Sequence, residues 1–152
     1  MSTTYSFYFK SNDNKFYPLD SFGGSSNVGQ AMDAKFGRNF AYCKRKPITK
    51  AELKEVADFE HDQACILEKE NEGWRQRQRD IGAWNNTIDE KRRAIADIDD
   101  AIDENNDEID CCRLAKSFFD FLIRILEEAS FSCESETDEN VDADKYIYWE
   151  VS

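Results

Sequence analysis

Carboxylates are the most abundant groups on this chain that can do chemistry, and they are clustered. The stretch 97–110 holds eight acidic residues and no basic one: Asp97, Asp99, Asp100, Asp103, Glu104, Asp107, Glu108 and Asp110. A second stretch, 127–144, holds another eight acids without a base. Rows of carboxylates on a rigid helix can imitate the phosphates of a nucleic acid and occupy a basic groove on another protein. The alternative interpretation is an ordinary solvated helix face followed by an acidic linker.

The charge of the whole chain agrees with an acidic surface. Its 152 residues include 32 acidic and 20 basic ones, for a net charge of -12. Such a field repels nucleic acids and anionic membranes and favours basic partners, including proteins that themselves bind nucleic acid. We therefore expect no direct contact with nucleic acid or membrane. The basic runs 44–46, 75–79 and 91–93 are expected to serve mostly as internal ion-pair partners.

The single histidine and three of the five cysteines are the best candidates for a metal site. His61 and Cys65 are four residues apart, so they share one face of a helix. Cys111 and Cys112 would lie at a similar height if the chain folded back on itself. Thiolates and imidazoles are zinc ligands, but adjacent residues on a helix point about 100° apart. We expect small buried thiols and a surface histidine instead, with no metal and no cofactor.

A loop rich in glycine and serine is the alternative ligand site. It consists of Gly23, Gly24, Ser25, Ser26 and Asn27. Backbone amides before a helix can hold a phosphate, yet the spacing matches neither a Walker motif nor a dinucleotide fingerprint. No nucleophile is paired with the histidine, and no carboxylate is marked by an apolar surrounding sequence. We expect no enzymatic activity.

The elements that would position these groups fall into two kinds. The first part, 1–48, is expected to be rich in β-structure: 4–11 alternates with aromatic residues on one face, and 15–19 suggests a short strand that Pro18 limits to an edge. One short helix is expected over 28–36. The segment 130–144 is predicted to be an acidic linker, and 145–152 a terminal strand that joins the N-terminal strands in one sheet.

Residues 49–129 have the period of amphipathic helices. Thr49 and Glu52 form a capping box, and apolar residues spaced for one helix face follow: Leu53, Val56, Phe59, Ile66 and Leu67. From Ile81 a heptad pattern begins. Its first core position holds Ile81, Ile88, Ile95, Ile102, Ile109, Lys116 and Ile123. Its second holds Trp84, Lys91, Ile98, Asn105, Cys112, Phe119 and Leu126.

Three arrangements of these helices are possible. The heptad phase continues across Asn85 and Asn86, which favours one rod that needs a second chain. A hairpin with its turn near 85–87 is favoured by the poor helix propensity of asparagine, by a second capping box from Thr87 to Glu90, and by the return of the C-terminal strand to the N-terminal sheet. It would also set the arginines at 75, 77 and 79 opposite the acids at 97, 99 and 100. A further break at 104–107 would give three helices. Asn105 at a core position fits either that break or a buried polar residue that sets the register of the seam.

The favoured prediction is an α+β fold of one domain: a long antiparallel helical hairpin, packed as a coiled coil, with a small antiparallel sheet from both termini. We expect a non-catalytic cytoplasmic protein, a monomer or homodimer, that binds a basic protein such as a nuclease. Its profile is that of a phage-encoded inhibitor of a bacterial defence protein, acting in the host cytoplasm. The contact residues would be the acids of 97–108 with Trp84, Asn85 and Asp89 at the turn. The alternatives are a nucleotide-binding or sequestering protein that uses the Gly-Ser loop and the aromatic sheet, and a structural coiled-coil oligomer.

Overall fold

The structure is a computed structural model that describes residues 3–37, 45–134 and 146–152, without the side chains of 130–134. The chain forms two compact units. The sheet unit consists of residues 1–60 and 115–152, and the hairpin unit of residues 61–114. The two long helices run through both units, and each unit has its own buried apolar residues.

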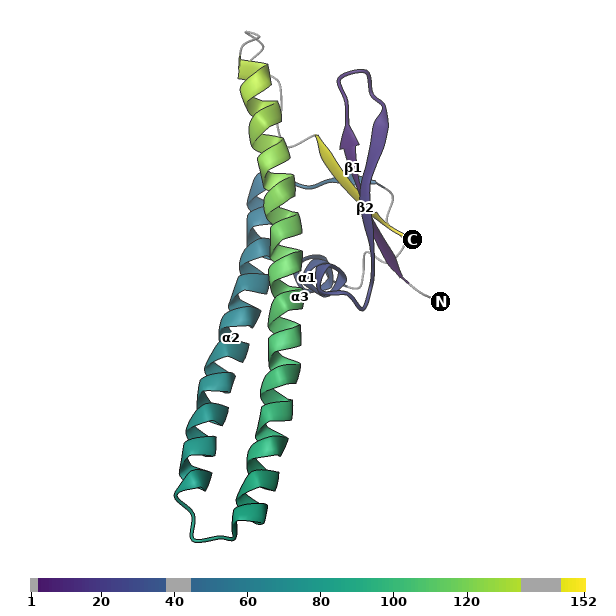
Figure 1. Cartoon of the computed structure of the whole chain (residues 1–152). Coiled ribbons are helices and arrows are strands. Elements are labelled where there is room, and N and C mark those ends of the chain that lie inside the picture. The colour runs from purple at the N-terminus through teal and green to yellow at the C-terminus, as the bar shows by residue number, and fades with distance from the viewer. Residues whose placement is uncertain (1–2, 38–44, 135–145) are drawn as a thin grey trace. The chain divides into compact units, whose positions relative to one another are not determined.

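A four-stranded antiparallel sheet forms from both ends of the chain, as predicted (Figure 1). Its strands are β1 (Thr4–Lys10), β2 (Phe16–Gly23), β3 (Lys46–Pro47) and β4 (Ile147–Val151). Their order is β2-β1-β4-β3, so the C-terminal strand lies beside the N-terminal one. Their ends are joined by hydrogen bonds from the Thr4 amide to the Ser152 carbonyl (2.9 Å) and from the Ser152 amide to the Thr4 carbonyl (3.0 Å).

Two features of the sheet differ from the prediction. β2 extends to Gly23 instead of ending near Leu19, and the β1–β2 register shifts between Phe7 and Tyr8, opposite the stretch that contains Pro18. A bulge accommodates a proline that cannot donate to the ladder. The two-residue strand β3 was not predicted, because so short a pairing has no periodicity of its own.

The core of the sheet unit lies between one face of the sheet and the helices (Figure 1). Phe7 of β1 and Trp149 of β4 are fully enclosed there with Met32 of α1 (Asn27–Phe36) and Phe119 of the last helix. The alternation predicted for both terminal strands therefore places one set of aromatic side chains inside, as expected for a half-buried sheet.

The two long helices are α2 (Lys50–Gly82) and α3 (Ile88–Glu134), packed side by side and joined by residues 83–87 (Figure 1). The hairpin is thus confirmed and the continuous rod is wrong. The first capping box forms in both directions: the Glu52 amide donates to Thr49 Oγ1 and the Thr49 amide to Glu52 Oε1, each at 3.0 Å. At the second, the Glu90 amide donates to Thr87 Oγ1 at 3.3 Å, while the Glu90 carboxylate accepts from the Asn86 side chain.

Helix α3 is unbroken through 104–107, so the three-helix alternative is wrong. It also runs to Glu134, five residues past the predicted end at Ala129. Residues 135–144, the remainder of the predicted acidic linker, lie outside the described residues.

The predicted heptad positions hold over most of α3. In the hairpin unit, Ile98 and Ile102 pack with Ile81, and Ile109 and Cys112 pack with Ala64. The pattern fails beside the turn, where Trp84 is 44% and Ile88 69% exposed, because the facing helix has ended there. Ile66, predicted to face the core, is 57% exposed, since the α2 seam follows Ala64 and Leu67 instead.

Candidate functional site

The eight acids between Asp97 and Asp110, called here the acidic row, are all exposed on α3. The seam residues of the same stretch, Ile98, Ile102 and Ile109, are buried, so most of the acids face away from α2. Asp99 and Asp110 lie at the edges of the acidic row, nearest to α2. Asp99 accepts a hydrogen bond from the Gln78 side chain at 2.6 Å, and Glu108 has a further interaction. Within the described part of the chain, no ion pair involves Asp97, Asp100 or the four acids at 103, 104, 107 and 110.

The predicted pairing of the acidic row with the arginines of α2 is wrong. Among the described residues, no ion pair joins Arg75, Arg77 or Arg79 to the acids at 97, 99 and 100, and the run 91–93 forms none either. Residues two apart on a helix point about 200° apart, so alternate arginines cannot share one face. Arg79 bonds to Gln76 instead (2.6 Å), and Lys91 donates to the Gly82 carbonyl at the end of α2 (3.1 Å). The pairing expected for the run 44–46 is found at Arg45, which contacts Glu150 at 3.3 Å.

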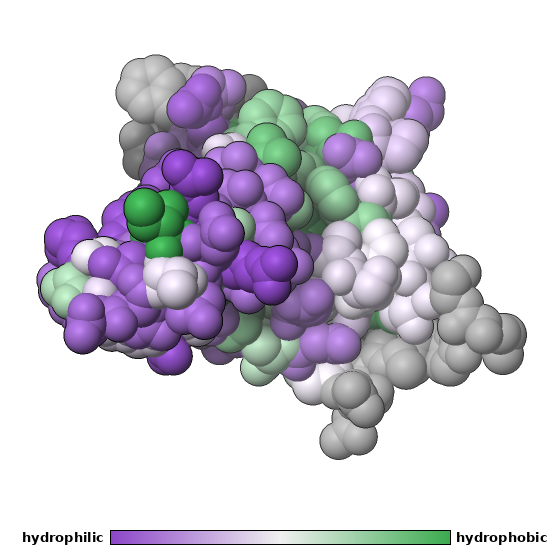
Figure 2. Space-filling model, turned by 60° about the horizontal axis from the view of Figure 1, so that its bottom comes forward, coloured by the Kyte–Doolittle hydropathy of each residue, from purple (hydrophilic) through white to green (hydrophobic). Residues whose placement is uncertain are grey.

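The predicted contact residues at the turn form a separate surface. Trp84, Asn85 and Asp89 are all exposed, as is Ile88 beside them. About 12 Å of helix separates Asp89 from Asp97. Figure 2 brings the bottom of Figure 1, the turn end of the hairpin, forward and shows a surface that is mostly hydrophilic, with a small strongly hydrophobic spot.

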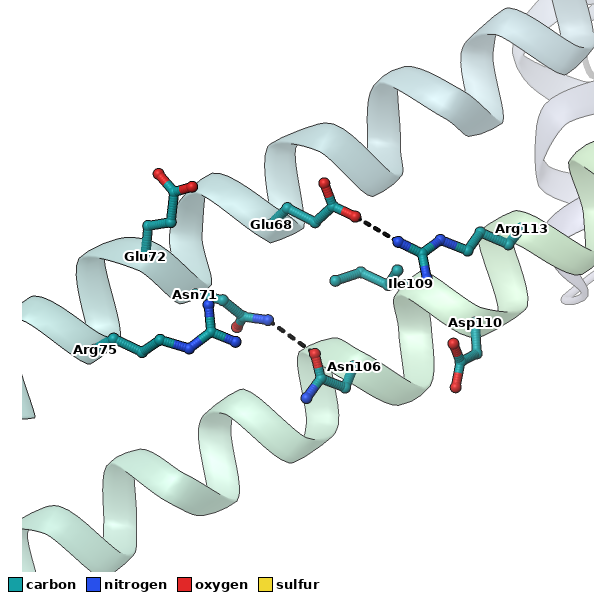
Figure 3. Close-up of a pocket in the computed structure, with 8 residues that line it drawn as sticks. All are labelled: Glu68, Asn71, Glu72, Arg75, Asn106, Ile109, Asp110 and Arg113. Carbon is teal, nitrogen blue, oxygen red and sulfur yellow. Dashed lines mark hydrogen bonds and ion pairs between the residues drawn. The ribbon is translucent and has the colours of Figure 1, made fainter.

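A groove lies along the seam of the hairpin unit (Figure 3). Its volume is about 530 Å³, and its lining residues are Glu68, Asn71, Glu72, Arg75, Asn106, Ile109, Asp110 and Arg113. Arg113 Nη2 contacts Glu68 Oε1 at 2.6 Å across the two helices. The groove was not predicted, because the sequence pattern does not say where two packed helices leave space between their side chains.

Three asparagines cross the seam at this groove. Asn71 is 2% exposed. Its Nδ2 donates to Asn106 Oδ1 at 3.1 Å, and its Oδ1 accepts from Asn105 Nδ2 at 3.0 Å. Asn105 was predicted either to break the helix or to set the register of the seam as a buried polar residue, and its bond to Asn71 agrees with the second. Asn71 was overlooked, although it follows Leu67 at seam spacing.

The Gly-Ser loop is occupied by contacts within the protein. Ser26 is the N-cap of α1, and its hydroxyl accepts from the Gly29 amide at 3.1 Å and donates to the Gly23 carbonyl at 2.5 Å. The Gly24 amide donates to the Thr3 carbonyl at 2.8 Å. Asn27 donates to Glu60 at 3.4 Å, and Ser25 is exposed. The amide of Gly24, the hydroxyl of Ser26 and the side-chain amide of Asn27 therefore already have partners.

The histidine and the cysteines do not converge. Cys65 Sγ lies 3.6 Å from His61 Nε2 on the same helix, Cys112 is buried in the seam and Cys111 is exposed. Within the described ranges, no three His, Cys, Asp or Glu side chains are placed to hold one metal ion.

The outer face of the sheet carries a cluster of charged and aromatic residues that was not predicted. The Arg45 guanidinium carbon lies 4.1 Å from the centre of the Tyr8 ring and 4.7 Å from that of Phe16. The Tyr8 hydroxyl donates to Glu150, and this hydrogen bond is the main reason that the pKa of Tyr8 is raised, with burial second. Each cation here already faces a ring or a carboxylate, so the cluster stabilises the sheet surface.

Comparison of this chain with protein-family models, curated proteins and solved structures finds no match. None of the helices in the described ranges has a stretch that is both apolar and long enough to cross a bilayer.

Proposed function

We propose that this protein is a non-catalytic interaction module whose acidic row binds a basic surface on a partner protein. The observation that carries the proposal is the state of these carboxylates. They are exposed on one helix, and six of the eight have no ion pair or hydrogen bond within the described part of the chain. A partner that binds them needs to break no internal ion pair, and its basic groups relieve the repulsion between like charges.

The spacing of the charges supports mimicry of a nucleic acid. The eight acids span thirteen helical steps, or about 20 Å, which gives roughly one charge per 2.5 Å of helix axis. Duplex DNA carries one charge per ~1.7 Å, and each of its strands one per ~3.4 Å. The acidic row lies between these two values. A groove evolved for a phosphate backbone would meet a similar linear charge density here.

The partner class follows from this charge density. A nuclease or another nucleic-acid-handling enzyme has the basic groove that the acidic row would fill, and blocking that groove inhibits the enzyme. The proposed role is thus an acidic inhibitor in the cytoplasm, in the host cell if the protein is encoded by a phage. Trp84 at the turn would add an aromatic anchor of the kind that dominates many interfaces.

The test is capture of partners from lysate of the native host with three proteins. These are the wild type, a variant with Asp100, Asp103 and Asp107 changed to lysine, and a control with the exposed Asp20, Asp58 and Asp62 changed to lysine. The control changes the net charge by the same amount as the variant, but its three substitutions lie outside the acidic row. We expect the wild type and the control to retain the same basic protein at low salt and the first variant to lose it.

Mimicry of a nucleic acid predicts a second result in the same experiment. Duplex DNA added to the wild-type column must elute the retained protein, because DNA and the acidic row would compete for one groove. Raised salt must elute it as well. A protein that stays bound to the variant, or that DNA does not displace, would contradict the proposal.

The alternative function, that of a nucleotide-binding protein, can be tested directly. A ligand at ~100 times its dissociation constant stabilises a protein by ~2.7 kcal/mol. If the interaction role is correct, thermal unfolding with a panel of nucleotides should show no such shift that depends on the Gly23–Asn27 loop. A shift that Ser25→Ala removes would favour the Gly23–Asn27 loop instead.

A further inference from the structure

The groove of the hairpin unit is lined by two arginines and two asparagines as well as by three carboxylates (Figure 3). The Arg75 guanidinium extends between the two helices. Across the described residues, it has no ion pair, hydrogen bond or other contact partner. Its planar group offers five N–H donors and no acceptor. An exposed arginine that lines a groove without a protein partner is available to bind an acceptor.

The opposite side of the groove adds further donors. Arg113 uses one terminal nitrogen, Nη2, on Glu68, which leaves its other donors available. Asn106 accepts from Asn71 through Oδ1, so its amide group still has both N–H donors. Asn71 lies at the floor, where its oxygen is taken by Asn105.

Only one of the three carboxylates that line the groove pairs with one of these donors. Glu68 is paired with Arg113. Glu72 and Asp110 point away from the space between the helices in Figure 3. Among the described residues, the Arg75 guanidinium and the remaining donors of Arg113 therefore have no recorded acceptor in this groove of about 530 Å³, a volume typical of small-ligand sites.

We propose that this groove binds an oxyanion, a phosphate or carboxylate group, between Arg75 and Arg113. The flat fork of arginine matches both groups with two parallel hydrogen bonds, and the Asn106 amide would donate a further one. The site lies between α2 and α3 and shares only Asp110 with the acidic row, and it does not depend on the proposed inhibitor role. A binding partner is not needed to detect it.

The experiment is isothermal titration calorimetry of the full chain with two probes at constant ionic strength. Pyrophosphate represents a phosphate source and succinate a carboxylate source, with chloride as the blank. We expect saturable binding of at least one probe, and the preferred probe identifies the source of the group. If neither probe binds in a saturable way at millimolar concentration, the proposal is overturned.

Three variants locate the site. Arg75→Gln should weaken binding about tenfold or more, since a hydrogen bond to a charged group contributes ~1.5–3 kcal/mol. Arg75→Lys keeps the charge but loses the fork, so it should fall between the wild type and Arg75→Gln. Arg77→Gln is the matched control: it removes the same charge from the same helix, outside the groove. Equal weakening by Arg75→Gln and Arg77→Gln would overturn the proposal, because it would mean binding by net charge alone.

Weaker binding by Arg75→Gln would not be caused by unfolding of the variant. Arg75 is exposed and has no partner to lose, so Arg75→Gln should unfold at the wild-type temperature. As an independent check, Glu72→Gln should strengthen binding, because it removes a negative charge at the rim without removing a donor. Unchanged or weaker binding by Glu72→Gln would contradict an anionic ligand.

Discussion

Two glycines of this fold should respond in opposite ways to substitution by alanine, because their surroundings differ. Gly73 lies inside α2 with open space where a Cβ would be, whereas a Cβ on Gly29 would lie 2.6 Å from the Gly23 carbonyl oxygen. We expect Gly73→Ala to stabilise the protein by about 0.5–1 kcal/mol through helix propensity. Gly29→Ala should destabilise it by about 1–3 kcal/mol through the clash. Urea unfolding of both variants measures the two effects, and a loss of stability in Gly73→Ala would contradict the open environment.

Because of Tyr8, the stability of the folded protein should decrease at alkaline pH. Its pKa is raised in the folded state, chiefly by the hydrogen bond to Glu150. A raised folded pKa means that the stabilisation is complete below the unfolded pKa of about 10 and is lost as pH rises through the folded value. We expect the unfolding free energy of the wild type to fall above pH 10 more steeply than that of Tyr8→Phe. Parallel pH dependence in the two proteins would show that this bond contributes nothing.

At the scale of the element, α3 carries an internal repulsion. Asp103 has acidic neighbours three or four residues away at Asp99, Asp100 and Asp107, all exposed. Like charges at this spacing destabilise a helix by ~0.2–0.5 kcal/mol per pair. Asp103→Asn should therefore stabilise the protein by up to about 1 kcal/mol at low salt. Thermal unfolding at low and at high sodium chloride tests this, and the gain should shrink at high salt because the charges are screened.

The register of the hairpin depends on its polar seam. Asn71 joins α2 to both Asn105 and Asn106 from a buried position. Asn71→Ala should lower the unfolding free energy by about 1–3 kcal/mol, since Asn105 loses its acceptor inside the seam. Gln63→Ala, at an exposed position of the same helix, serves as control and should change stability by less than about 0.5 kcal/mol. Similar values for both variants would remove the argument for a register role.

For the whole molecule, the hairpin changes what oligomer is expected. A rod would leave its apolar seam open and require a second chain, but here α2 and α3 bury the seam within one chain. We expect sedimentation to give the monomer mass of 17.7 kDa at micromolar concentration. A mass twice as large that persists at high salt would mean that the exposed apolar residues of the helices form a lasting interface.

Periodicity and capping were enough to predict the fold class of this protein. The alternation of the terminal strands, the Thr49 capping box and the heptads of α3 are local patterns, and the physical reason for each acts within a few residues. The turn was predicted from the asparagines at 85 and 86 for the same reason. The exposure of the acidic row followed from its position between seam residues on one helix.

Only the tertiary structure decided which polar groups meet. Whether Arg75 pairs with an acid, stays without a partner or faces a groove depends on the rotation of α2 against α3, which spacing along one helix does not determine. The same holds for Arg45, 105 residues from Glu150 in the chain, and for Asn71 across the seam from Asn106. Local patterns arise from neighbours in sequence, whereas these contacts arise from how two elements pack, and that packing is set by side chains from both.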